Sequence, residues 1–231
     1  MAIFSLDGFL ILLRWIHFMA GITWIGMLYY LNFAQTPFLA TELGGTARSP
    51  MLRGLVPSVL WWFRWGAMIT FLTGWTIVIT KMVVGGSSSV YYATILTGGF
   101  LGTFMWFNVW FVIMPRQYKI MANAENVAAG KPADPAAAAV APVAGRASRT
   151  NTLFSIPMLF FMGAASHFPQ LASRMEPMVV PYLVGVLVIA AICEANIFTG
   201  TVPKPLSTVS GTIHSGLGLT LVLYVLAAAL L

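Results

Sequence analysis

Six long apolar stretches divide this 231-residue chain, and their length decides the fold class. About 20 helical residues cross the hydrocarbon core of a bilayer. Inside lipid every backbone polar group needs a partner within the protein, and apolar runs of this length meet that need as helices rather than as barrel strands. We therefore predict an all-α, polytopic membrane helix bundle with about six transmembrane helices. The stretches are residues 9–33, 60–84, 90–114, 152–168, 178–199 and 211–231.

Charge is scarce and unevenly placed. Only 8% of the residues are charged, against about 25% in a typical soluble domain. The net charge of +6 does not indicate nucleic-acid binding, because the basic residues lie between the apolar stretches, where they are topology signals. The single cysteine, Cys193, excludes an intramolecular disulfide. Residues 1–8 contain no Lys or Arg, so we expect the first stretch to remain as a span rather than to be cleaved as a signal peptide.

The distribution of Lys and Arg predicts the orientation. The loops after the first, third and fifth stretches contain eight of them, whereas the opposite side has Arg174, with Lys81 at a span end. The positive-inside rule then places both termini on the non-cytoplasmic side of the membrane. The eight are Arg48, Arg53, Arg116, Lys119, Lys131, Arg146, Arg149 and Lys204.

The longest loop, residues 115–150, contains the sequence KPADP and then an Ala/Pro/Val run. It lacks apolar periodicity and large aromatic residues after its first part, so we predict a flexible cytoplasmic linker. Residues 1–231 then form a single membrane domain.

Two of the three histidines are expected near the same face of the membrane. His17 lies about eight residues inside the first stretch, and His167 ends the fourth stretch, which runs back outward. An ionisable residue at bilayer depth usually faces the bundle interior and a partner. Neutral imidazole is a common ligand of haem iron, so this pair predicts a b-type haem.

Neighbours of His17 fit the same interpretation. Gly21 and Trp24 follow at +4 and +7, on one helical face, where Gly21 would leave room for a flat macrocycle. Arg14, one turn outward, could pair with a haem propionate. In the alternative interpretation, His17 forms a hydrogen bond between helices and Arg14 extends its charge to the membrane surface.

A second polar pair is expected at the cytoplasmic side. Glu194 lies near the inner end of the fifth stretch and His214 near the inner end of the sixth, and a short loop joins the two stretches. One hypothesis is a proton-uptake pair, and the other is a structural hydrogen bond near the interface.

Three groups of segments carry a family resemblance. They are residues 13–26 (LRWIHFMAGITWIG), residues 101–103 with 108–117 (LGT, NVWFVIMPRQ), and residues 151–162 with 166–169 (NTLFSIPMLFFM, SHFP). In order and spacing they resemble the N-terminal membrane domain of the membrane-anchored bacterial urate oxidases, or urate hydroxylases. His17 and His167 occupy matching positions.

The resemblance implies a part in purine catabolism: oxidation of urate to 5-hydroxyisourate, with electrons leaving through cytochrome c. The chain departs from the family pattern in three ways. We expect a short form without the cytochrome c domain; the 34–59 loop lacks a His-Gly-Gly-Gly segment, and Leu96 or a neighbour, and Thr150, stand where the pattern has histidines.

Three functions remain open at this point. The first is a haem-binding redox protein that passes electrons from urate or a related small reductant to a separate cytochrome c. The second is a non-catalytic membrane subunit, or a haem-binding scaffold without urate chemistry. The third is a transporter that uses Glu194 and His214, although the six stretches show no inverted repeat.

Overall fold

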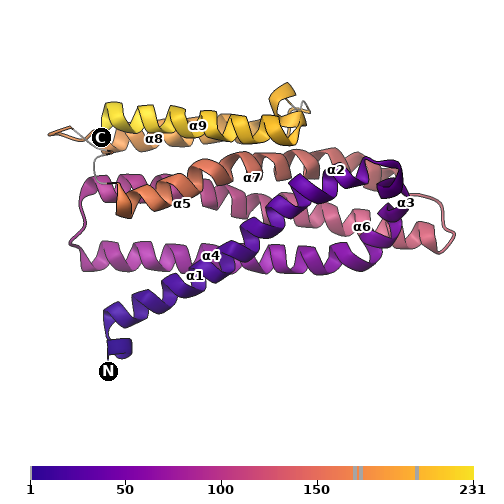
Figure 1. Ribbon diagram of the computed structural model, residues 1–231, viewed down its shortest axis with the longest axis horizontal. Helices are drawn as coiled ribbons and strands as arrows, with labels where there is room; N and C mark the ends of the chain where they lie inside the picture. Colours follow the sequence, from indigo (N-terminus) through magenta and orange to yellow (C-terminus); the bar gives the residue numbers. More distant parts are fainter. Residues whose placement is uncertain (1, 169–170, 172–173, 201–202) are drawn as a thin grey trace.

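The computed structural model describes residues 2–168, 171, 174–200 and 203–231. In this part of the chain, six helical rods run along the long axis of the molecule (Figure 1). Each rod contains most of one of the predicted apolar stretches, so the all-α architecture is confirmed. Pro169, near which we expected the fourth helix to end, lies outside the described residues.

Each of the first three rods consists of two α-helices joined by a π-helical segment. Their parts are α1 (Leu6–Tyr29), η2 (Tyr30–Gln35) and α2 (Thr36–Leu39); α3 (Glu42–Pro50), η3 (Met51–Leu55) and α4 (Val56–Val84); and α5 (Ser89–Phe107), η4 (Asn108–Ile113) and α6 (Met114–Ala128). The other rods are α7 (Pro135–His167), α8 (Val179–Ala195) and α9 (Val209–Leu230), with short 3-10 turns η1 (Ala2–Phe4) and η6 (Lys204–Ser207).

A proline explains the position of each π-helical segment. Pro37, Pro57 and Pro115 each occupy the first turn of the α-helix that follows such a segment. Proline cannot donate to the carbonyl one α-helical turn earlier, and its ring crowds that carbonyl. The residue after each π-helical segment instead donates to the carbonyl five residues back, as Met114 does to Val109. The wider turn lets the rod continue past the proline.

Hydroxyl and carboxylate side chains cap the N-termini of five α-helices. An N-cap side chain accepts a hydrogen bond from a backbone N–H that lacks a partner in the first turn. Such caps begin α1, α3, α5, α7 and α9, and α4 ends at Gly85, which has a φ of 78°. The capping residues are Ser5, Thr41, Ser88, Asp134 and Thr208.

Small residues set the closest helix contacts. A Cβ on Gly66 of α4 would lie 3.1 Å from the backbone nitrogen of Trp24 on α1. A Cβ on Gly98 of α5 would lie 2.7 Å from Cγ of Met162 on α7. Backbones therefore approach without a side chain between them, as small residues permit in membrane helices.

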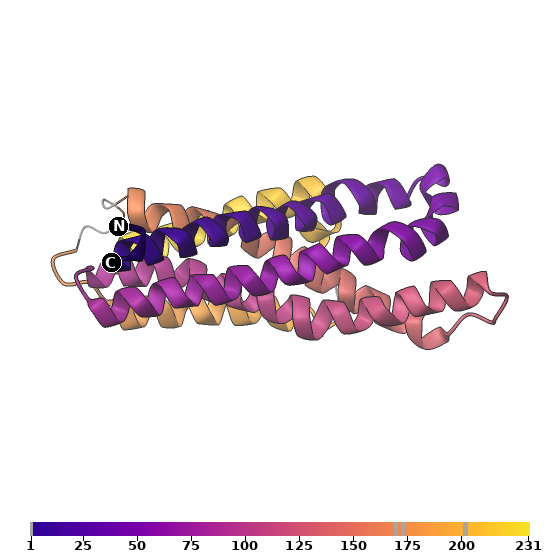
Figure 2. The same ribbon diagram turned by 90° about the horizontal axis from the view of Figure 1, so that it is seen from below.

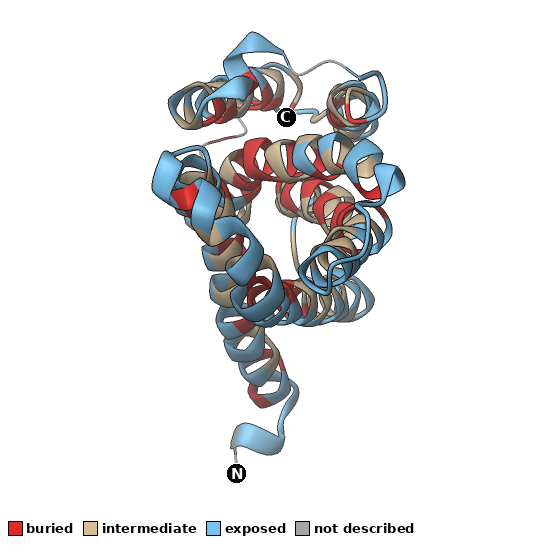
Figure 3. Ribbon diagram, turned by 90° about the vertical axis from the view of Figure 1, so that its right-hand side faces the viewer, coloured by how far each residue is buried: buried red, intermediate tan, exposed pale blue. Residues whose placement is uncertain are grey.

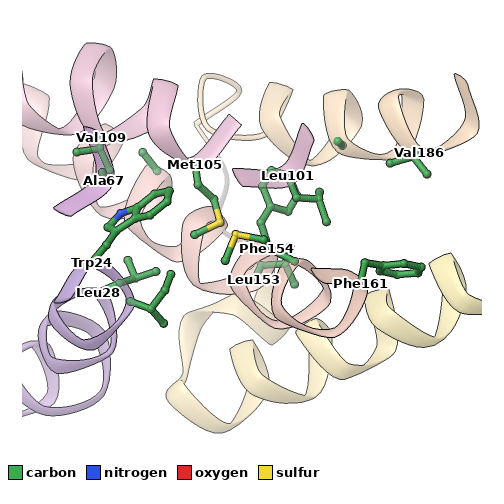
Figure 4. Packing of buried hydrophobic residues seen from close by; sticks show 14 of the residues in the cluster. Trp24, Leu28, Ala67, Leu101, Met105, Val109, Leu153, Phe154, Phe161 and Val186 are labelled. Atoms are coloured by element: carbon green, nitrogen blue, oxygen red, sulfur yellow. The ribbon is translucent and has the colours of Figure 1, made fainter. Parts of the chain in front are cut away.

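The rods are arranged in pairs. α1 crosses α4 diagonally, α5 packs on α7, and α8 and α9 cover α5 and α7 (Figures 1 and 2). Buried faces point toward the middle of the bundle, whereas large apolar side chains such as Phe18 and Ile22 are exposed on the outside (Figure 3). Figure 4 shows the centre, where Trp24 from α1, Met105 from α5 and Phe154 from α7 pack together.

Among the described residues, four helical rods are long and apolar enough to cross a membrane: Leu6–Leu39, Glu42–Val84, Ser89–Ala128 and Val209–Leu230. α8 is apolar but has only 17 residues. The two ends of the chain lie at the same end of the bundle (Figures 1 and 2).

The predicted linker is different in the structure. Residues 115–150 are helical except for a short connection, because α6 continues to Ala128 and α7 begins at Pro135. Alanine has the highest intrinsic helix propensity, and Pro135 follows the Asp134 cap at the first helical position, where proline is favoured. The Ala/Pro/Val run therefore forms the first turns of α7.

Candidate functional site

His17 of α1 packs against α4. Its ring lies over Gly74, where a Cβ would be 2.9 Å from Cε1 of the imidazole. Its Nδ1 lies 3.1 Å from Oγ1 of Thr73, and that hydroxyl donates to the carbonyl of Ile69 at 2.6 Å. Because the Thr73 proton is used in this way, Thr73 accepts from Nδ1–H of His17. Nδ1 of His17 then carries a proton, and in a neutral ring the lone pair is on Nε2.

The same face of α1 is filled by α4. A Cβ on Gly21 would lie 3.9 Å from Thr70, and Trp24 is only 1% exposed, beside Ala67 (Figure 4). The space that we expected beside Gly21 for a macrocycle is therefore occupied by Thr70. Gly21 and Trp24 serve helix packing here, while Arg14, one turn toward the N-terminus, is half-buried.

His167 is the last residue of α7, and its side chain is exposed. Tyr29 of α1 bonds to Ser155 of α7 at 2.9 Å, and both histidines lie twelve residues from this tie toward the same end of the bundle. At 1.5 Å per residue, each is about 18 Å from it. Beyond the tie, α1 leaves α7 and crosses α4 (Figure 1), so the two imidazoles lie at similar depth on diverging helices.

Glu194 and His214 do not form the pair that we expected. His214 is exposed and its Nδ1 lies 2.8 Å from the carbonyl of Ser210, within its own helix. Glu194 instead faces α5, where its carboxyl lies beside the side chain of Asn108. Both carboxyl oxygens are buried and reach no hydrogen-bond partner in the described part of the chain.

Asn108 belongs to a buried polar chain that the sequence analysis did not identify. Its amide donates to Oδ1 of Asn151 at 2.9 Å, and the amide of Asn151 donates to the carbonyl of Met105 at 3.0 Å. Both asparagines are fully buried. The available signal was the presence of Asn108 in an otherwise apolar run, since buried polar residues in membrane helices need a partner. Asn151, next to Thr150 and Thr152, gave no such signal.

A cavity of about 320 Å³ separates α5 from α8 at Glu194. Apart from the carboxyl and Thr103, its lining is apolar. The hydroxyl of Thr103 is already used, because it donates to the carbonyl of Gly99 and accepts from Nε1 of Trp75. The remaining lining residues are Phe100, Phe104, Phe107 and Leu187.

Arg64, in the N-terminal part of α4, contacts three aromatic side chains. The guanidinium of Arg64 lies 5.4 Å from the ring centroid of Trp65 and 5.2 Å from that of Trp110, and it donates to the hydroxyl of Tyr118. Cation–π contacts of this kind stabilise a charge away from water. Arg64 thus joins α4 to η4 and α6.

Fold and site together define an all-helical bundle with helices able to cross a membrane and with buried polar side chains in its interior. The family model described as Urate oxidase N-terminal matches residues 87–228, more than half of the chain, and the chain belongs to this family. The matched segment includes Asn108, Asn151, His167 and Glu194, whereas His17 precedes it. Comparison with curated proteins found no match. Comparison with solved structures found none either.

Proposed function

We propose that this chain is an integral protein of the bacterial inner membrane that takes part in redox chemistry. In this proposal it binds b-type haem and passes electrons from urate or a related small reductant to a separate cytochrome c. Family membership supports the redox class. The observation that carries the haem assignment is the Nδ1–H···Oγ1 bond from His17 to Thr73, which leaves Nε2 free to coordinate a metal.

The residues around His17 fit this group in part. A metal-binding histidine usually donates its other ring N–H to a fixed acceptor, which orients the ring and raises its basicity. Thr73 supplies that acceptor. His167, toward the same end of the bundle, would be the second histidine to hold the haem, and Arg14 would offer a charge to a propionate. Gly21 and Trp24 contribute no space, because α4 fills it.

Bound haem would supply one-electron transfer. The chain itself would hold the imidazole of His17 in one tautomer against Gly74 and keep water from its inner edge.

A difference spectrum tests the assignment. The full chain, purified in detergent and supplied with haem, should give a b-type band in the reduced-minus-oxidised spectrum. His17→Ala and His167→Ala should each abolish the band, whereas His214→Ala, a matched change on an exposed histidine, should retain it. Absence of the band from the loaded wild-type chain, or its persistence in His17→Ala, would overturn the assignment.

A second candidate is a non-catalytic membrane subunit in which His17 only joins α1 to α4. The contact between His17 and Thr73 also suits this role, and Leu96 and Thr150 stand where the family pattern has histidines. Cytochrome c reduction by urate in vesicles that contain only this chain would exclude it. Copurification of a stoichiometric redox partner, with no turnover by the isolated chain, would favour it.

A further inference from the structure

Glu194 is an acidic group held inside the bundle. It lies on α8, an apolar helix, and both of its carboxyl oxygens are buried without a hydrogen-bond partner in the described structure. An ionised carboxylate in such surroundings is strongly disfavoured unless a charge or several donors compensate it. The site therefore needs a positively charged or proton-donating occupant.

The side chain of Asn108, next to Glu194, also needs a hydrogen-bond donor. The carbonyl of Met105 can only accept, so Asn151 directs its NH₂ toward it and turns its Oδ1 to the NH₂ of Asn108. This sequence of donors leaves Oδ1 of Asn108 as an acceptor, and that atom is buried without a donor. Asn108 lies beside Glu194, and its Oδ1 and both carboxyl oxygens of Glu194 are each buried without a hydrogen-bond partner in the described part of the chain.

The surroundings of the Glu194 carboxyl favour a proton over a metal ion as the occupant. Hard cations take six or more oxygen ligands, whereas the adjacent cavity is lined mainly by phenylalanine and leucine. Thr103, the other polar group in its lining, already has both a donor and an acceptor partner. One proton satisfies both residues, because a neutral carboxyl can donate to the amide oxygen.

Two arginines near this end of α8 are already engaged, and Lys204 of η6 is exposed. On α7, Arg146 donates to the carbonyl of Ile197 at 2.7 Å, and Arg149 donates to Thr212 at 3.5 Å. α5 contains no charged residue. The remaining titratable neighbours are Cys193 on α8 itself and His214 on α9, which is bonded within its own helix.

We propose that Glu194 and Asn108 form an intramembrane proton-binding site, in which the neutral carboxyl of Glu194 donates its O–H to Oδ1 of Asn108. The proton reaches it from the end of α8 where a second cavity, of about 410 Å³, is lined by Cys193, Asn196 and Thr199. This replaces His214 by Asn108 as the partner of Glu194. The site is independent of the haem assignment, because it shares no residue with it.

Infrared spectroscopy of the full chain in lipid tests the proposal. A carboxylic C=O band that shifts in D₂O should be present at neutral pH, disappear at alkaline pH, and be missing from Glu194→Gln. Glu125→Gln is the matched control, because Glu125 is exposed and paired with Arg53 at 3.4 Å. It should retain the band. Asn108→Leu keeps the carboxyl but removes its acceptor, so the band should move to higher frequency.

Two results would overturn the assignment. One is the absence of any band that depends on Glu194 at neutral and mildly acidic pH, with Asn108→Leu spectrally identical to the wild type. The other is loss of the band when sodium chloride is added at constant pH, which would assign the three oxygens to a sodium ion. Because Asn108→Leu is read on the native carboxyl, the test holds even where Glu194→Gln does not fold.

Discussion

The amide of Asn108 on the α5 rod donates to Oδ1 of Asn151 on α7 at 2.9 Å, across 43 positions of sequence. Water does not reach either side chain, since both residues are fully buried. The bond joins the α5 rod to α7 and holds the side chain of Asn108 beside Glu194 of α8. The packing of two helices and the polarity at Glu194 therefore depend on one contact.

Asn151→Leu tests this contact. The change leaves the side-chain amide of Asn108 buried without its acceptor, so it should lower the free energy of unfolding by about 1–3 kcal/mol. The carbonyl of Met105 still accepts from the backbone N–H of Asn108. The double variant Asn108→Leu/Asn151→Leu should lose less than the sum of the single changes, because two apolar side chains need no partner. Thermal unfolding in detergent measures both. Strict additivity would contradict the coupling.

Thr73→Val tests the orientation of His17. Valine has nearly the same shape as threonine but cannot accept the Nδ1 proton, so the tautomer is no longer fixed. If His17 binds haem, the affinity should fall by about 10–100-fold, the usual effect of losing such a partner. Thr73→Ser should retain the affinity. Thr76→Val is the control, because Thr76 bonds only to Leu72 of its own helix; an equal loss in both variants would refute the role of Thr73.

Two glycines should respond oppositely to alanine. Gly66→Ala places a Cβ 3.1 Å from the backbone of Trp24 and 3.2 Å from that of Ala20, so α1 must move away from α4. The expected cost is about 1–3 kcal/mol, as for other overpacked sites. Gly99→Ala meets nothing within 4 Å and should stabilise the helix by up to about 1 kcal/mol. Chemical unfolding of both variants measures the difference, and equal stabilities would contradict the close contact.

Arg64→Lys tests the contacts of Arg64 with its aromatic neighbours. Lysine keeps the charge but loses the planar group that contacts the rings of Trp65 and Trp110 and the bond to Tyr118. Tryptophan fluorescence should shift, and stability should fall by about 1 kcal/mol. Tyr118→Phe, which removes only the hydroxyl, should give a smaller change. Unaltered fluorescence in Arg64→Lys would show that the guanidinium does not contact the rings.

The sequence predicts the positions of the helices better than it predicts which side chains contact one another. Apolar length located all six rods, because helix formation in lipid depends on local backbone satisfaction. Even the error at 115–150 had a local signal, the Asp134 cap followed by Pro135 and alanines. No local signal in the sequence identified the partner of Glu194, because the carboxyl on α8 could have faced α9 as readily as α5. Only the packing of the whole bundle decides between them.

The π-helical segments have a consequence for comparing members of the family. A π-helical turn contains one residue more than the α-helical turn it replaces, so removing one residue from Asn108–Ile113 would yield a continuous helix. The faces of α6 would then keep their orientation relative to α5, with Tyr118 still beside Arg64. A single-residue alignment gap just before Pro37, Pro57 or Pro115 thus marks the exchange of a π-helical turn for an α-helical one inside a rod, and not a change in a loop.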